Sequence, residues 1–267
     1  MRANLVIPML TSAAAAMAND NPFGYSNDSG ITKKGEYELQ QSVTMRSGLD
    51  QGAGFDGGYL GFDLTTQLET GLSDSEHLDI KVNEASLRSA SFRGFRFAGL
   101  GLGYKHLIRS DAQGGWGAAW GAEIDYGQLD GASGALRTET SYSASLMLQR
   151  SFGACRQWYY LTNVSVGLAH DGSATTGAAE WSQGLARRAD EHWACGVETV
   201  VDGAWKHFRS VDHSSLRGGP SVAYKHGGFS ASLTYLWQIA GSPATEGQRD
   251  LADISRSEAR FLAAWEF

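Results

Sequence analysis

The chain of 267 residues has few cysteines and no excess of positive charge. Its two cysteines, Cys155 and Cys195, are too few for a disulfide scaffold and lack the spacing of a metal site. They can form one bond only if their Cα atoms lie within about 7 Å of each other. The 22 basic and 29 acidic residues give a formal net charge of −7, and no basic cluster marks a nucleic-acid surface. We therefore expect no nucleic-acid partner.

Clustered histidines and long apolar runs are also missing. Six histidines are dispersed, with none at metal-ligand spacing: His77, His106, His170, His192, His207 and His226. We therefore expect no metal and no other cofactor. Beyond the first residues, no stretch approaches the roughly 18 to 20 apolar residues that a membrane-spanning helix requires. If the protein enters a membrane, it does so as strands.

The first residues have the features of a secretory signal. Arg2 precedes an apolar run, and Ala16-Met17-Ala18 ahead of Asn19 is the small-x-small arrangement that a signal peptidase accepts. The alternative is an amphipathic first helix of a soluble domain, but the run lacks polar residues at helical spacing. We predict a signal peptide over residues 1–18 and a single domain over residues 19–267.

Alternation of apolar and polar residues, bounded by turn residues, predicts twelve strands. In the first, Tyr37, Leu39 and Val43 face one side while Glu38 and Arg46 face the other. The predicted strands are 35–47, 58–70, a third around 78–83, 94–107, 116–127, 140–152, 157–169, 177–189, 192–205, 215–225, 228–239 and 255–267. An even number of antiparallel strands places both termini at one end and lets the first and last strands pair.

The connections between these strands favour a closed up-and-down barrel. Every second connection is short, and most of these are tight turns. The others, including 49–57, 84–93, 206–214 and 240–254, are expected to be longer loops. Predicted strands of roughly 10 to 13 residues match a tilted membrane crossing and exceed the 5 to 6 residues typical of soluble sheets. A secreted β-sandwich or soluble barrel is the alternative, because its strands also alternate.

The two predicted faces differ in composition. Outward-facing aromatic residues gather near the tight turns, as in an interfacial girdle: Trp116, Trp158, Tyr160, Trp193, Tyr224, Phe229, Trp265 and Phe267. The charged residues face inward and are the candidate lumen lining: Glu36, Glu38, Arg46, Asp63, Glu69, Asp79, Lys81, Lys105, Glu123, Asp125, Glu198, Asp202, Arg217, Lys225, Glu258 and Arg260. Gly99, Gly101 and Gly103 also face inward and leave wall on which a solute or a bulky neighbour fits.

The last strand, FLAAWEF, alternates and ends on an aromatic residue. With Phe261, Trp265 and Phe267 on one face, it resembles the C-terminal assembly signal of bacterial outer-membrane barrels. That resemblance implies recognition by the barrel assembly machinery. Two stretches, NPFGYSNDSGITKKGEYELQQSVTMRSG and RGGPSVAYKHGGFSASLTYLWQI, are similar to a group of small Gram-negative outer-membrane barrel proteins, some described as solute transporters. The group supplies no catalytic residues.

These observations predict a monomeric, porin-like barrel in the bacterial outer membrane, in contact with its lipids and lipopolysaccharide. Twelve tilted strands enclose a backbone cylinder about 24 Å across, and inward side chains reduce the bore to about 10 Å or less. Such a lumen either passes small polar solutes or is sealed by charges that pair across it. A sealed barrel would have a structural or surface-recognition role. The third alternative is a lipid hydrolase using His213 and Ser215, in or beside a loop near the rim and next to Asp212.

Overall fold

The computed structural model describes residues 21–49, 58–88, 93–112, 115–129, 135–206 and 210–267. The predicted signal peptide lies outside these residues. The strands are β1 (Tyr37–Ser47), β2 (Leu60–Gly71), β3 (Glu76–Arg88), β4 (Arg93–Arg109), β5 (Gly117–Leu129), β6 (Leu136–Phe152), β7 (Trp158–His170), β8 (Thr175–Arg188), β9 (Trp193–Lys206), β10 (Ser210–His226), β11 (Phe229–Ser242) and β12 (Ser257–Glu266). One turn of 3-10 helix, η1 (Ala154–Arg156), lies between β6 and β7. Among the described residues, no helix is long and apolar enough to cross a membrane.

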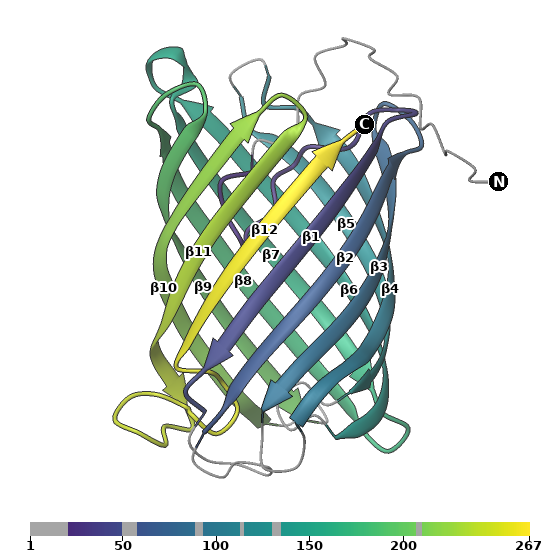
Figure 1. The fold of residues 1–267 in the computed structure, drawn as a ribbon, viewed down its shortest axis with the longest axis vertical. Coiled ribbons are helices and arrows are strands. Elements are labelled where there is room, and N and C mark those ends of the chain that lie inside the picture. Colours follow the sequence, from purple (N-terminus) through teal and green to yellow (C-terminus); the bar gives the residue numbers. More distant parts are fainter. Residues whose placement is uncertain (1–20, 50–57, 89–92, 113–114, 130–134, 207–209) are drawn as a thin grey trace, which may run out of the picture.

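The twelve strands form a closed antiparallel barrel, which confirms the predicted fold class (Figure 1). Each strand pairs with its neighbours in the chain, and β12 closes the cylinder on β1, from Glu38 opposite Glu266 to Ser47 opposite Ser257. The start of β1 and the end of β12 therefore lie at one end of the barrel, which we call the terminal end. The opposite end, where β1 leads into β2, is the loop end.

The alternation of long and short connections is only partly as predicted. At the loop end, the connections 48–59 and 243–256 are long, but β3 reaches Arg88 and β4 begins at Arg93. The predicted loop 206–214 is also wrong, because β10 begins at Ser210. Antiparallel pairing needs only backbone groups, so these strands continue beyond the point where apolar alternation ends. The sequence pattern therefore underestimates their length.

Apolar side chains cover the outside of the cylinder. Ile80 on β3 and Val166 on β7 are 54% and 56% exposed, as are many other outward aliphatic residues. Aromatic rings form a band around the terminal end, where Trp193 and Tyr224 have centroids 4.9 Å apart. A soluble sandwich would bury such side chains between two sheets. The outward apolar belt is instead the surface that a barrel presents to hydrocarbon.

The inside of the barrel is not empty. The segment 21–34, which precedes β1, runs within the cylinder at the terminal end, where the start of the described chain is drawn in dark purple (Figure 1). At the loop end, Leu49, Tyr59, Ala85 and Leu87 form a small apolar cluster. The lumen between these two regions is the polar interior to which the candidate site belongs.

Candidate functional site: the barrel lumen

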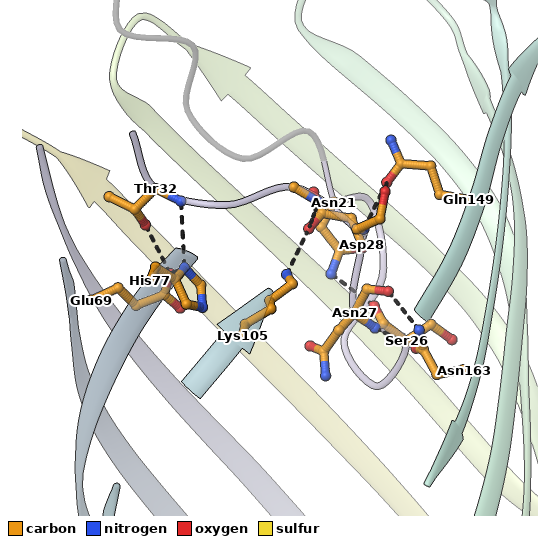
Figure 2. A network of polar contacts seen from close by, with 12 residues as sticks. Asn21, Ser26, Asn27, Asp28, Thr32, Glu69, His77, Lys105, Gln149 and Asn163 are labelled. Carbon is orange, nitrogen blue, oxygen red and sulfur yellow. Dashed lines mark hydrogen bonds and ion pairs between the residues drawn. The ribbon is translucent and has the colours of Figure 1, made fainter. Parts of the chain in front are cut away.

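The segment 21–34, here called the N-terminal segment, is attached first to β2, β3 and β4. Thr32 donates its hydroxyl to Glu69 at 3.1 Å and its backbone N–H to Nδ1 of His77 at 3.4 Å. Asp28 lies 3.5 Å from Nζ of Lys105, and Figure 2 shows these contacts side by side. The segment therefore supplies one hydrogen-bond donor to Glu69 and an ion-pair partner to Lys105.

The segment then crosses to β6 and β7 on another part of the wall. The Asn163 side chain accepts the N–H of Asn27 at 2.6 Å and donates to its carbonyl at 2.7 Å (Figure 2). Gln149 accepts the N–H of Ser29 at 2.9 Å. The Asn163 side chain thus bonds both backbone groups of Asn27, as a neighbouring strand would, and satisfies them without a sheet.

Glu198 on β9 holds the deepest part of the segment. Its carboxylate accepts the consecutive backbone N–H groups of Gly24, Tyr25 and Ser26, at 3.2, 3.0 and 2.5 Å. The residue is 0% exposed. Burying an ionised carboxylate costs several kcal/mol unless donors surround it, and three N–H groups turned to one point supply them. The segment and Glu198 therefore stabilise each other.

An aromatic anchor follows next to this contact. Phe23 is 1% exposed and packs against Leu161 and Ala186. A Cβ atom at Gly184 would lie 2.6 Å from the Phe23 ring, so β8 needs glycine here to admit it. Beside it, Ser221 donates its hydroxyl to the carbonyl of Pro22. The ring thus lies in a pocket that the wall provides for it.

Tyr25 meets the arginine residues of the wall. The Arg260 guanidinium lies 3.9 Å from the centre of its ring, and that of Arg217 lies at 5.8 Å. The Tyr25 hydroxyl donates to Glu258 at 3.0 Å. Arg217 pairs with Glu258 at 2.6 Å and with Asp202 at 2.9 Å. Cation–π contacts and a hydrogen bond therefore fix the tip of the segment in the lumen.

Most of the predicted lumen residues lie in pairs or in contact with the segment. Arg46 and Asp63 form a bidentate pair at 2.6 and 2.8 Å. Lys81 pairs with Glu123 and lies 3.8 Å from Asp79. Glu38 accepts a hydrogen bond from Gln40, and Glu69 accepts from Thr32 and Gln40. Arg260 donates to the Thr44 hydroxyl and to the Gly24 carbonyl. Asp125 lies over Gly101, and Lys225 lines a small cavity with Asn21. Glu36 precedes β1 and pairs with Lys33 at 3.8 Å.

The inward glycines of β4 do not leave open wall. A Cβ atom at Gly101 would collide with the carboxylate of Asp125, and one at Gly103 with that of Asp79. The sequence predicts either a solute or a bulky neighbour over these glycines. At Gly101 and Gly103 the space is filled by neighbouring side chains. Glycine at these positions makes room for two acidic groups on β3 and β5.

Two neighbouring cavities remain beside the N-terminal segment. The larger has a volume of about 290 Å³ and lies between Tyr25 of the segment and the inward residues of β1, β2 and β3. The smaller, of about 150 Å³, lies toward β4 and β5. Both are lined by Gln40, Gln67 and Lys81, so the two cavities adjoin. A third cavity of about 240 Å³ lies near His213 on another part of the wall.

The hydrolase candidates lie in a strand and are not arranged as a nucleophile and base. His213 and Ser215 both belong to β10, which begins at Ser210. The Ser215 hydroxyl donates to Asp202 at 2.6 Å, and Asp202 also binds Arg217. A nucleophilic serine needs a base to accept its proton, whereas this serine is part of an ion-pair network.

Sequence reasoning missed two segments of the described chain that enter the barrel. The N-terminal segment reads as a polar, glycine-containing leader, and its only signals are the aromatic Phe23 and Tyr25 among polar residues. The connection 243–256 also turns inward: Leu251 is buried, and the Asp250 carbonyl accepts from the inward-facing Gln238 at 3.0 Å.

Cys155 and Cys195 are both free. Among the described residues, no group of three metal-ligating side chains occurs.

A family model matches residues 15–267, almost the whole chain. The chain belongs to DUF6662, a family of unknown function. Among solved structures, it is similar to the COG4313 outer membrane channel from Pseudomonas putida F1, with a TM-score of 0.59 and 9% identity over 92% of this chain and 99% of that one. It is also similar to the NanC porin, with a TM-score of 0.53 and 9% identity over 85% and 98%. At these identities the likeness shows the barrel fold alone. No curated protein matches the chain.

Proposed function

We propose that this DUF6662 protein is an outer-membrane channel for small polar solutes, narrowed by its own N-terminal segment. The apolar belt and aromatic band favour a membrane-spanning barrel. Two solved barrels to which the chain is similar are a channel and a porin. The terminal end would face the periplasm, where bacterial barrels have their short turns.

The observation that carries this proposal is the placement of the ion pairs. A barrel sealed by its wall would pair charges across the lumen. Here Arg46 and Asp63 join β1 to β2, Lys81 and Glu123 join β3 to β5, and Arg217 joins β10 to β9 and β12. Each of these pairs links strands at most two places apart around the cylinder. These charges follow the wall, and the lumen is crossed at the terminal end by the N-terminal segment, which non-covalent contacts hold.

Liposome swelling tests the channel directly. Protein folded into phospholipid vesicles should admit a monosaccharide such as arabinose slowly and exclude a tetrasaccharide such as stachyose, because the cavities beside the segment are small. A Phe23→Ala, Glu198→Ala double variant, which loses the main anchors of the segment, should admit arabinose faster. The sealed alternative is supported instead if neither the wild-type protein nor this variant swells vesicles, although both are folded.

The closing strand supports a further part of the proposal. Phe261 and Trp265 of β12 are 45% and 44% exposed, and Phe267, directly after β12, is 69% exposed. We infer that the barrel assembly machinery binds these residues and that the assembled protein is a monomer in contact with lipids and lipopolysaccharide. Phe267→Ala should lower the amount of folded protein in the outer membrane, whereas Phe95→Ala, at an exposed residue near the loop end, should not. Equal yields would contradict this inference.

A further inference from the structure

The larger cavity beside the N-terminal segment has a lining rich in uncharged polar groups. On β1, β2 and β3, consecutive inward positions supply hydroxyl and amide side chains: Gln40, Ser42, Thr44, Thr65, Gln67 and Asn83. Each of these groups has a donor, an acceptor or both, and none changes charge near neutral pH. An array of this kind matches a solute with several hydroxyl groups around a small frame.

The charged residues of the same cavity balance one another. Two are acidic, Asp63 and Glu123, and two are basic, Lys81 and Arg260. Arg46 donates hydrogen bonds to both carboxylate oxygens of Asp63, and Glu123 pairs with Lys81. Arg260 is bound to Thr44 and to the Gly24 carbonyl. Two partners lie outside the lining, Arg46 beside Asp63 and Asp79 beside Lys81. With both included, three acidic and three basic groups balance, so the cavity gives little net attraction to an ion. It favours a neutral solute.

The size of the cavity limits the solute further. Its volume of about 290 Å³ is near the lower limit, about 300 Å³, of sites that enclose small molecules. One sugar ring or an open-chain polyol fits such a space, whereas an oligosaccharide does not. The adjoining cavity of about 150 Å³ leads along the same part of the wall toward β4 and β5.

We propose that the cavity between the N-terminal segment and β1–β3 binds a small neutral polyhydroxylated solute, of the class of monosaccharides and sugar alcohols. This proposal rests on the proposed channel, since it names the solute class that the channel would hold on its way through the lumen. The hydroxyl and amide groups of β1–β3 would bond the solute, and the balanced ion pairs would discriminate against its charged analogues.

Three probes that differ in one functional group test the charge preference. D-glucose is neutral, D-gluconate is anionic and D-glucosamine is cationic at neutral pH. Binding to the full-length protein in detergent micelles is measured by saturation-transfer difference NMR, with titration of each probe. Glucose should bind most tightly. Tighter binding of gluconate or glucosamine, or binding of none of the three, would overturn the proposal.

A matched pair of double variants tests the location. Ser42→Ala with Thr65→Val removes two hydroxyl groups from the cavity and leaves the volume of each side chain nearly unchanged. Ser165→Ala with Thr176→Val makes the same two changes on inward positions of β7 and β8, away from this cavity. Two lost hydrogen bonds should weaken glucose binding about tenfold in the first variant and leave it unchanged in the second. Equal affinity in both variants would contradict the assigned site.

The binding experiment and the swelling experiment can fail separately. Glucose that enters vesicles without measurable binding in micelles would exclude the binding site and leave the channel intact. Glucose that binds in micelles, with no swelling by the wild-type protein or by the Phe23→Ala, Glu198→Ala variant, would exclude the channel and leave a closed binding barrel.

Discussion

Replacement of Glu198 by alanine should release the N-terminal segment from the wall. The carboxylate accepts three consecutive N–H groups of the segment, from Gly24, Tyr25 and Ser26. The Gly24 N–H also donates to the Thr234 hydroxyl at 3.0 Å, so the variant loses two bonds outright, those of Tyr25 and Ser26. A hydrogen bond to a charged acceptor contributes about 1.5 to 3 kcal/mol, and we take about 1.5 kcal/mol for each because water enters the lumen. The total of about 3 kcal/mol raises the population of released segment about a hundredfold.

Hydrogen exchange measured by mass spectrometry checks this prediction in the intact protein. In the wild type, the amides of residues 24–26 should be protected, and in Glu198→Ala a peptide covering them should exchange about a hundredfold faster. Glu139→Gln is the matched control, because it removes the charge of a carboxylate that pairs with Arg137 at 3.3 Å rather than with the segment. Barrel strands should keep their protection in both variants. Unchanged exchange of residues 24–26 in Glu198→Ala would refute the role of Glu198 as the main contact of the segment.

Three further predictions concern the segment, a turn and the hydrolase alternative. Phe23→Ala removes a buried ring, which should destabilise the docked segment by about 3 kcal/mol. Amide hydrogen exchange of residues 21–26 should then become faster while the strands stay protected. Exchange as slow as in the wild type would contradict this prediction. In the loop-end turn, the backbone N–H groups of Ser173 and Ala174 hold the pKa of Asp171 well below its ordinary value. Ionised Asp171 therefore stabilises the turn at pH values above its ordinary pKa, and this stabilisation is lost as pH falls through its pKa in the folded protein. Asp171→Ala should speed amide exchange in the turn at pH 7 but not in strong acid. An equal effect at both pH values would contradict this prediction. Finally, neither the wild type nor Ser215→Ala should release fatty acid from phospholipid vesicles, and release by the wild type alone would restore the hydrolase.

The barrel could be predicted from the sequence because its strands repeat one local rule. Alternation with period two separates the outward Leu39 from the inward Glu38, and every predicted strand corresponds to a strand of the barrel. Strand ends were less predictable. The pairing of β9 with β10 continues through Val211 beyond the apolar pattern, supported by backbone bonds that any sequence can make.

The contents of the lumen could not be predicted in this way. Alternation identifies Arg217 as inward-facing, but its partners depend on how the tilted strands are offset, which the sequence alone does not determine. The N-terminal segment has no period at all. Its contacts join residues far apart in the chain, such as Gly24 with Glu198 and Asn27 with Asn163. Only its two aromatic residues among polar ones distinguish it from an ordinary leader.

Single-channel recording in planar bilayers tests the central claim most directly. The wild type and the Phe23→Ala, Glu198→Ala variant are compared in the same lipid and salt, with Glu139→Gln as the control. If the N-terminal segment narrows a polar channel, the double variant should show larger or longer openings than the wild type and the control. Folded double variant that passes no current would contradict the account, because the lumen would then be closed by something other than the segment.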